Sequence, residues 1–187
     1  MPSPLLKNPF SVREALSLGL SKAYLTRRVK AGTLARLSRG VYQVSGANEG
    51  IGEHLYKIAA LRCGMPSAIC LLSALENYHV TDQISKKTWV LVPEPKRVSS
   101  KDLKLIRSRH PQWEIGIRKG KDYWITTLER TLIDCLLYKR LVGSQIALEA
   151  IKQALTQKKV KLGSLYDMAK KMGAEHRVRP YIEALAS

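Results

Sequence analysis

The sequence predicts an α+β protein in which two short helices and a hairpin come first, a small mixed sheet follows, and helices are concentrated at the C-terminal end. Apolar residues recur at helical spacing on both sides of Gly19 and again over residues 127–185. Between residues 89 and 125, short apolar runs are bounded by Gly, Pro and charged turns, which is typical of strands. The chain has 187 residues, 45% of them hydrophobic, which is enough to build a core for one or two small domains.

Two short helices separated by a tight turn are predicted near the N-terminus. Ser11 is a suitable N-cap for the first, which ends at Gly19, and Ser21 is a suitable N-cap for the second, which ends at Gly32. The positions whose spacing places them on the inner faces are Val12, Ala15, Leu16, Leu25 and Val29. Two short helices with these caps and stops are typical of a helix-turn-helix, whose second helix lies in the major groove of DNA.

A β-hairpin is predicted directly after this pair. Residues 34–37 and 41–44 are strand-like runs on either side of a turn that ends at Gly40. In winged helix-turn-helix domains such a hairpin places basic residues on phosphate, which sets the register on DNA without reading its sequence. Arg36 and Arg39 are the candidates for this contact. The alternative for the same elements is a small helical bundle with a solvated cationic face.

The charge of the chain favours a nucleic-acid partner. It has 32 Lys and Arg against 15 Asp and Glu, a formal net charge of +17, and such an excess is most often retained for holding a polyanion. Residues 1–46 contain eight basic residues and a single acid, Glu14. With the apolar face inward, the second helix presents a basic outer face to double-stranded DNA. Its candidate DNA-binding residues are Ser21, Lys22, Tyr24, Thr26, Arg27, Arg28 and Lys30.

Small and polar residues at 45–50 predict a boundary between a winged helix-turn-helix domain over residues 1–46 and an α+β domain over residues 50–187. The strands expected in the second domain are 89–92, 114–118 and 123–125. Its expected helices are 53–63, a helix capped by Ser67 that runs to Tyr78, a helix after Thr126 with a capping box to Glu129, one beginning at Ser144, one around Leu165 that ends at Gly173, and a short one at 181–185.

The sequence predicts a cytoplasmic protein without a cofactor or a metal. Its longest apolar run, 68–72, is far shorter than the roughly 20 residues that span a bilayer, and its N-terminus does not resemble a signal peptide. Cys63, Cys70 and Cys135 lie in apolar segments without the spacing of a zinc site, which predicts three small buried hydrophobic side chains.

The hairpin segment Gly32–Tyr42 resembles the wing signature of AbiEi-type antitoxins, which belong to the type IV (abortive infection) toxin–antitoxin systems of bacteria. Segments similar to the same family follow in order at 73–75, 79–80, 89–93 and 128–134. The resemblance implies a non-enzymatic, DNA-binding antitoxin of a phage-defence system. Such a protein represses its own operon by binding an operator, expected to contain inverted repeats, and neutralises a nucleotidyltransferase-like toxin with its C-terminal domain.

One departure from that family concerns the first nine residues. Family members usually place a helix before the helix-turn-helix pair, whereas Pro2, Pro4 and Pro9 leave room here for at most one short turn.

A second hypothesis is a basic metal-dependent nuclease or nucleic-acid-modifying protein that is targeted by a winged helix. Asp82 upstream of Glu94-Pro95-Lys96 imitates an Asp…Glu-x-Lys metal site, although proline disturbs the extended alternation that would aim Glu94 and Lys96 at one metal ion. Further basic runs at 138–140 and 158–161 are candidates for extending a phosphate-binding surface. Arg130 and Asp134, at i and i+4, predict a structural ion pair.

Overall fold

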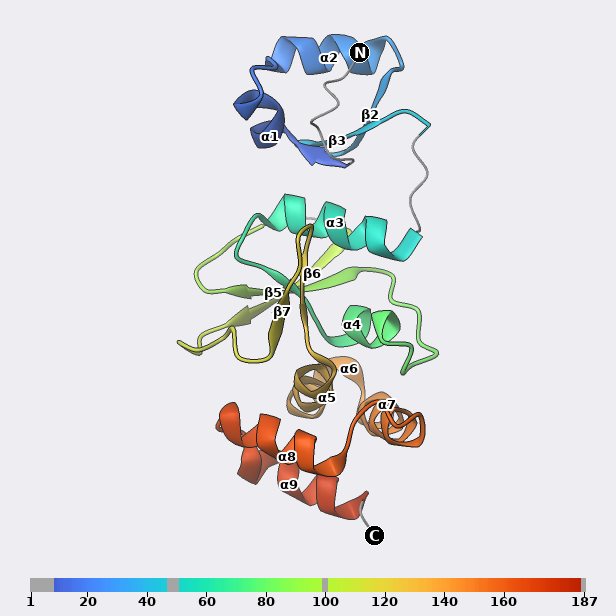
Figure 1. Cartoon of the computed structure of the whole chain (residues 1–187), viewed down its shortest axis with the longest axis vertical. Helices are drawn as coiled ribbons and strands as arrows, with labels where there is room; N and C mark the ends of the chain where they lie inside the picture. Colours follow the sequence, from blue (N-terminus) through green and yellow to red (C-terminus); the bar gives the residue numbers. More distant parts are fainter. Residues whose placement is uncertain (1–8, 47–50, 99–100, 186–187) are drawn as a thin grey trace. The chain divides into compact units, whose positions relative to one another are not determined.

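The structure is a computed structural model that describes residues 9–46, 51–98 and 101–185 (Figure 1). The chain divides into two compact units, the N-terminal unit Met1–Met65 and the C-terminal unit Pro66–Ser187. Part of the segment in which the sequence places the domain boundary, 47–50, lies outside the described residues, as do residues 1–8 with Pro2 and Pro4. The helix at 51–63, assigned to the second domain from the sequence, belongs to the N-terminal unit.

The N-terminal unit consists of a three-stranded antiparallel sheet with helices. The strand order is β1-β3-β2, so the hairpin β2–β3 is extended by a short strand that precedes both helices. Its elements are β1 (Phe10–Ser11), α1 (Val12–Ser17), α2 (Lys22–Lys30), β2 (Leu34–Ser38), β3 (Val41–Val44) and α3 (Ile51–Cys63).

Both predicted helix caps of the N-terminal unit are present. Ser11 and Glu14 form a reciprocal capping box on α1, and the Ser21 hydroxyl accepts a hydrogen bond from the Tyr24 amide at 3.1 Å. One buried core cluster of this unit contains Phe10, Ala15, Leu25, Leu34 and Tyr42. The prediction that Leu16 faces inward was wrong: its side chain is 46% exposed, because the short helix α1 buries only the face that carries Ala15.

Helix α3 follows the hairpin and contacts β1 and β3. The side chains that it buries are Tyr56, Ala59, Ala60 and Cys63, whereas Leu55 remains 49% exposed. The buried face of α3 is therefore the one that carries Tyr56, and Leu55 lies outside it. Because α3 contacts both β1 and β3, it stabilises the sheet of the N-terminal unit.

The C-terminal unit is a mixed five-stranded sheet with a set of helices that follows it in the chain, as the fold class predicts. The strand order is β6-β5-β4-β8-β7. The pairs β4–β8 and β5–β6 are parallel, and β4–β5 and β7–β8 are antiparallel. Its elements are β4 (Ala68–Ile69), α4 (Leu71–Asn77), β5 (Thr88–Pro93), β6 (Leu103–Ser108), β7 (Ile117–Lys119), β8 (Trp124–Thr126), α5 (Leu128–Leu137), α6 (Lys139–Val142), α7 (Ser144–Thr156), α8 (Leu162–Lys171) and α9 (Glu175–Ala184).

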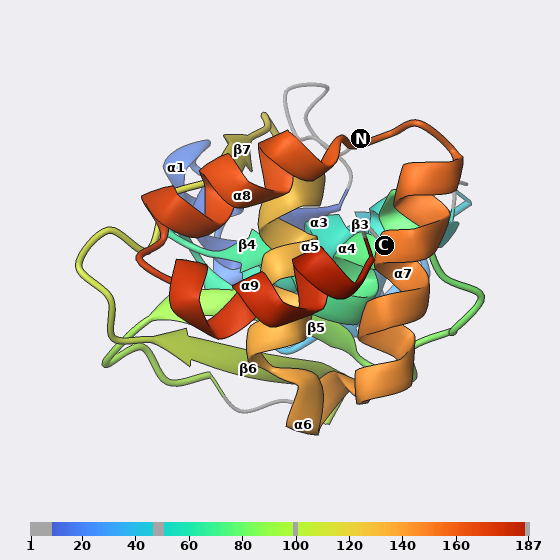
Figure 2. The ribbon, with the colours of Figure 1, turned by 90° about the horizontal axis from the view of Figure 1, so that it is seen from below.

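Helix α5 is the centre of the C-terminal unit. It packs against α4, α7, α8 and α9, and it lies between the sheet and the outer helices α8 and α9 (Figures 1 and 2). Leu132, Ile133 and Cys135 of α5 are fully buried, so this helix joins the sheet layer to the outer helical layer. The predicted inner face of α7 is confirmed, since Ala147, Ala150, Ile151 and Ala154 are all buried.

Two predicted element boundaries in the C-terminal unit were wrong. The helix expected from Ser67 begins only at Leu71, because Ala68–Ile69 pair with β5 on one side and with β8 on the other. The strand expected at 114–118 is reduced to Ile117–Lys119. Gly116 adopts a φ of +67° just before it, where an added Cβ would lie 2.7 Å from the Cβ of Arg130.

The cap of α5 is Thr127 rather than Thr126. The Thr127 hydroxyl accepts a hydrogen bond from the Arg130 amide at 3.3 Å, whereas the Thr126 hydroxyl lies in the core, 2.7 Å from that of Thr131. All three cysteines are buried, as predicted. No helix in the described part of the chain is long and apolar enough to cross a membrane.

Candidate nucleic-acid interface

Helix α2 has one inner face and one basic outer face. Leu25 is 1% exposed, and Val29 packs against the same core, so the opposite side of the helix is in solvent. The exposed residues among the predicted contacts on α2 and at its N-cap are Ser21, Lys22, Thr26, Arg27 and Lys30. Lys22, Arg27 and Lys30 make no ion pair with any described residue, so their charges are available to an external anion.

Tyr24 and Arg28 occupy the edge of this face, as predicted. Both are half-buried, and the Arg28 guanidinium carbon lies 5.7 Å from the centroid of the Tyr24 ring. Because Tyr24 holds the guanidinium against the side of the helix, Arg28 has less freedom than Arg27.

The Thr26 side chain is partly committed to the helix itself. Its hydroxyl donates a hydrogen bond to the Lys22 carbonyl at 3.0 Å. The Thr26 hydroxyl can therefore still accept a hydrogen bond from a partner but cannot donate one. The methyl group of Thr26 remains available for an apolar contact.

The hairpin presents two further exposed cations. Arg36 lies on β2 opposite Tyr42, and Arg39 lies in the turn beside Gly40, whose φ of +79° closes the hairpin. The Phe10 and Tyr42 rings are stacked with centroids 6.1 Å apart, so β1 supports the hairpin from its other edge. Arg36 and Arg39 thus project from a strand pair that is fixed to the core.

Hydrogen bonds join the hairpin to both helices. The Val12 amide at the start of α1 donates to the Gly40 carbonyl at 2.9 Å. Beyond the end of α2, the Ser45 hydroxyl donates to the Gly32 carbonyl at 2.6 Å and the Ser45 amide to the Thr33 carbonyl at 3.2 Å. The cations of α2 and of the hairpin are therefore held on one rigid body.

The single acidic residue of segment 9–46 is Glu14, and it is engaged within α1. Its Oε2 atom accepts hydrogen bonds from the Ser11 amide at 2.7 Å and from the Ser11 hydroxyl at 2.9 Å. Neither α2 nor the hairpin contains an acid. The surface formed by α2 and the hairpin, defined by the nine predicted contact residues and called here the basic face, thus carries positive charge alone.

Glu94 and Lys96, two residues of the nuclease hypothesis, are engaged in other contacts. Glu94 pairs with the Nε atom of Arg109 at 2.7 Å, and the Lys96 ammonium donates to the Pro66 carbonyl at 2.9 Å. Among the described residues, no group of three or more His, Cys, Asp and Glu side chains is placed to hold a metal ion.

The basic runs of the C-terminal unit contribute partly to packing. The Lys139 ammonium contacts the Tyr181 hydroxyl and lies 4.5 Å from the centroid of its ring. The Lys159 ammonium donates to the Tyr78 carbonyl at 2.6 Å. Lys139 and Lys159 thus each contact another residue of the C-terminal unit through the ammonium group, whereas no such contact is made by Lys22 or Arg27 on α2 with a described residue.

The predicted Arg130–Asp134 ion pair is confirmed, and it is buried. The Nε atom of Arg130 lies 2.7 Å from Oδ2 of Asp134, and the two side chains are 8% and 4% exposed. Burial raises the pKa of Asp134 to about 6, although the Arg130 charge and its hydrogen bond act to lower it. Sequence spacing identified this pair but not the carbonyls of Trp113 and Ile115, to which Arg130 also donates.

The basic face can be compared with known families. Residues 5–45 match the model of a family described as transcriptional regulator, AbiEi antitoxin. This confirms the resemblance drawn from the hairpin, and the AbiEi match contains all nine predicted contact residues. The later resembling segments, from residue 73 onward, lie outside the AbiEi match.

A solved structure is similar to this chain over nearly its full length. The crystal structure of the RV2827C protein from Mycobacterium tuberculosis is similar with a TM-score of 0.61 and 10% sequence identity, covering 95% of this chain and 72% of that one. At this identity the similarity shows a shared fold. No curated protein matches the sequence.

Proposed function

We propose that this chain is a DNA-binding antitoxin that represses its own operon, with α2 and the hairpin β2–β3 acting as a winged helix-turn-helix. The observation that supports the proposal is the basic face: unpaired cations, without an intervening acid, on the segment that matches a family of transcriptional regulators. Such a surface binds duplex DNA by replacing condensed counterions on its phosphates.

The two parts of the basic face have different proposed roles. Helix α2 enters the major groove, where Lys22 near its N-terminus and Arg27 on its outer face reach base edges, and Arg28 lies beside them. Lys30 and the hairpin residues Arg36 and Arg39 contact phosphate, which sets position without sequence information. Ser21, Tyr24 and Thr26 complete the surface at its edges.

The C-terminal unit is proposed to neutralise a nucleotidyltransferase-like toxin. Its basic residues are mixed with acids and are partly engaged in internal contacts, so it lacks the uniform positive surface of α2 and the hairpin. A toxin reading frame adjacent to that of this chain would support this role.

Binding to the DNA immediately upstream of the chain's own reading frame tests the proposal. Fluorescence anisotropy should show specific binding of the full chain that weakens steeply with salt, and the Arg27→Ala, Arg28→Ala double variant should lose specificity. Arg109→Ala is the matched control, because it removes an exposed guanidinium from the C-terminal unit. Equal affinity for the upstream sequence and for scrambled DNA would contradict the repressor function.

The nuclease hypothesis has a separate test. The contacts of Glu94 and Lys96 give it no support, since each has a partner within the C-terminal unit. Metal-dependent cleavage of DNA by the full chain, abolished in Glu94→Ala, would establish it in place of the repressor.

A further inference from the structure

The C-terminal unit contains a pocket of about 370 Å³ that the proposed DNA binding does not use. It is formed by the β6–β7 connection, helix α5, the α8–α9 connection and the first turn of α9. This volume lies within the range of roughly 300–1,000 Å³ that is typical of small-molecule sites.

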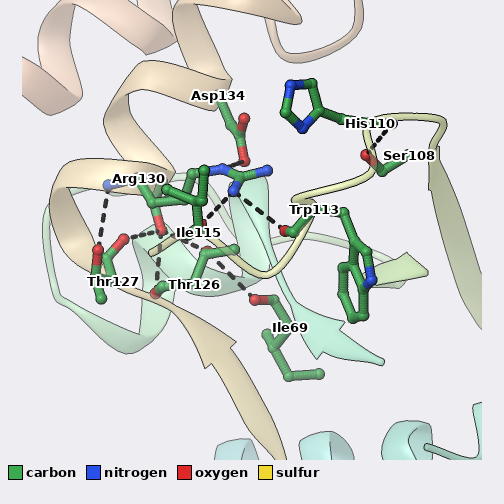
Figure 3. A network of polar contacts seen from close by, with 10 residues as sticks. Ile69, Ser108, His110, Trp113, Ile115, Thr126, Thr127, Arg130 and Asp134 are labelled. Atoms are coloured by element: carbon green, nitrogen blue, oxygen red, sulfur yellow. Dashed lines mark hydrogen bonds and ion pairs between the residues drawn. The ribbon is translucent and has the colours of Figure 1, made fainter. Parts of the chain in front are cut away.

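The floor of the pocket is the Arg130–Asp134 pair (Figure 3). The Arg130 guanidinium uses Nε for Oδ2 of Asp134 and Nη1 for the carbonyls of Trp113, at 3.3 Å, and Ile115. These contacts leave Nη2 of Arg130 and Oδ1 of Asp134 without a hydrogen bond to any described residue. Both side chains line the pocket and are only 8% and 4% exposed, so the pocket offers a donor and an acceptor on neighbouring side chains that the protein has already desolvated.

This floor selects the chemistry of a ligand. A donor and an acceptor on two side chains in contact with each other suit a planar group that carries an acceptor beside an N–H donor, an edge that each of the four nucleobases has. The lining also includes apolar residues that would contact a planar ring, Ile115, Leu137 and Met172, together with polar ones such as Gln112 and Tyr138.

The mouth of the pocket favours an anion. Arg177 on α9 is exposed, and its side chain makes no hydrogen bond or ion pair with a described residue. Burial raises the pKa of the neighbouring Tyr138 phenol, and the Arg177 charge acts to lower it. His110 accepts a hydrogen bond from the Gln112 amide on Nδ1 at 3.1 Å, which leaves Nε2 for a partner.

We propose that this pocket binds a nucleoside monophosphate, with the base edge on Nη2 of Arg130 and Oδ1 of Asp134 and with the phosphate at Arg177. The site lies entirely within the C-terminal unit, so it is independent of DNA binding by the basic face.

Calorimetric titration of the full chain with AMP, GMP, CMP and UMP tests the proposal directly. At least one of them should bind, and ribose 5-phosphate and the matching nucleoside should each bind about tenfold or more weaker, since each provides only half of the recognised groups. Binding of ribose 5-phosphate as tight as that of the nucleotide would reduce the site to an anion contact and overturn the proposal. So would the absence of binding by all four nucleotides.

Two variants on α9 locate the phosphate. Arg177→Gln should weaken the nucleotide about tenfold and leave binding of the nucleoside unchanged. Arg179→Gln is the matched control, because Arg179 lies on the same helix outside the pocket lining, paired with Glu183 at 2.6 Å. Equal effects of the two variants would overturn the placement. Affinity for operator DNA should be the same in both, so failure of this site leaves the proposed repressor function untouched.

Discussion

The two units use arginine in opposite ways. On α2 of the N-terminal unit, Arg27 is exposed and without an ion pair, so its charge is available to a partner. On α5 of the C-terminal unit, Arg130 is buried and held by a carboxylate and two backbone carbonyls. The two arrangements predict different consequences for stability: removing the exposed Arg27 charge should leave the folded state intact, whereas unpairing the buried Arg130 charge should destabilise it.

The largest expected effect is on stability. Asp134→Ala leaves the buried Arg130 charge without its partner and should lower the free energy of unfolding of the C-terminal unit by about 3–5 kcal/mol. Trp89, Trp113 and Trp124 are the only tryptophans of the chain and all belong to this unit, so urea unfolding followed by tryptophan fluorescence measures it selectively.

A double variant separates the missing partner from the lost packing. Arg130→Met with Asp134→Leu removes both charges while it retains side-chain volume, and it should recover most of the lost stability. If the double variant were as unstable as Asp134→Ala, the unpaired charge would not be the cause.

On the basic face, the matching experiment changes binding alone. A substitution of a base-reading arginine, tested with Arg27→Ala, should cost about 1–3 kcal/mol of discrimination at one position of the operator, with no change in the unfolding of the protein. Anisotropy titrations against single-base operator variants measure this. Unchanged operator affinity in a folded Arg27→Ala, Arg28→Ala double variant would show that α2 does not contact the DNA.

The hairpin should behave differently from α2. Arg36→Ala with Arg39→Ala should weaken binding to all DNA sequences alike, and each lost phosphate contact should flatten the slope of log affinity against log salt by about one unit. In cells, this variant should lose repression of the operon promoter yet still protect its host from the co-expressed toxin. Loss of both activities in a variant that circular dichroism shows to be folded would contradict the division of function between the units.

The smallest expected effect is a pH dependence confined to the buried pair. The pKa of Asp134 is about 6 in the folded protein, above the value of about 3.9 in an unfolded chain, so the folded state holds the proton more tightly between these values. The Asp134 contribution to the free energy of unfolding should therefore rise, by about 1 kcal/mol, as the pH falls from 7 to 5.

The control for the pH dependence is again the Arg130→Met, Asp134→Leu variant, which keeps every other titratable group, including His110 in the same pocket. Subtracting its pH profile from that of the unsubstituted protein isolates Asp134. A difference that stays constant from pH 7 to pH 5 would contradict the raised pKa.

Elements with strong local signals were predicted well. The caps at Ser11 and Ser21, the hairpin closed at Gly40 and the inner face of α7 all depend on residues within a few positions of one another. The exposure of Lys22 and Arg27 followed from the spacing of Leu25 and Val29 alone.

Elements that depend on distant partners were missed. Strand β6 was not predicted, because its buried residues Leu103 and Ile106 are three apart and lack the alternation of a half-buried strand. It forms through its parallel pairing with β5. Likewise Ala68–Ile69 lie in an apolar stretch compatible with a helix, and only pairing on both sides makes them a strand.

By itself, the sequence determined the local architecture: two capped helices, a hairpin, a surface of unpaired cations, and an ion pair at i and i+4, since neighbouring residues meet whatever the rest of the chain does. Only the tertiary structure decided that α3 packs on the first sheet, that Arg130 is also bound by the carbonyls of Trp113 and Ile115, and that α5, α9 and the β6–β7 connection enclose a pocket. The physical reason is that these contacts join residues far apart in the chain, where local spacing carries no information about which surfaces meet.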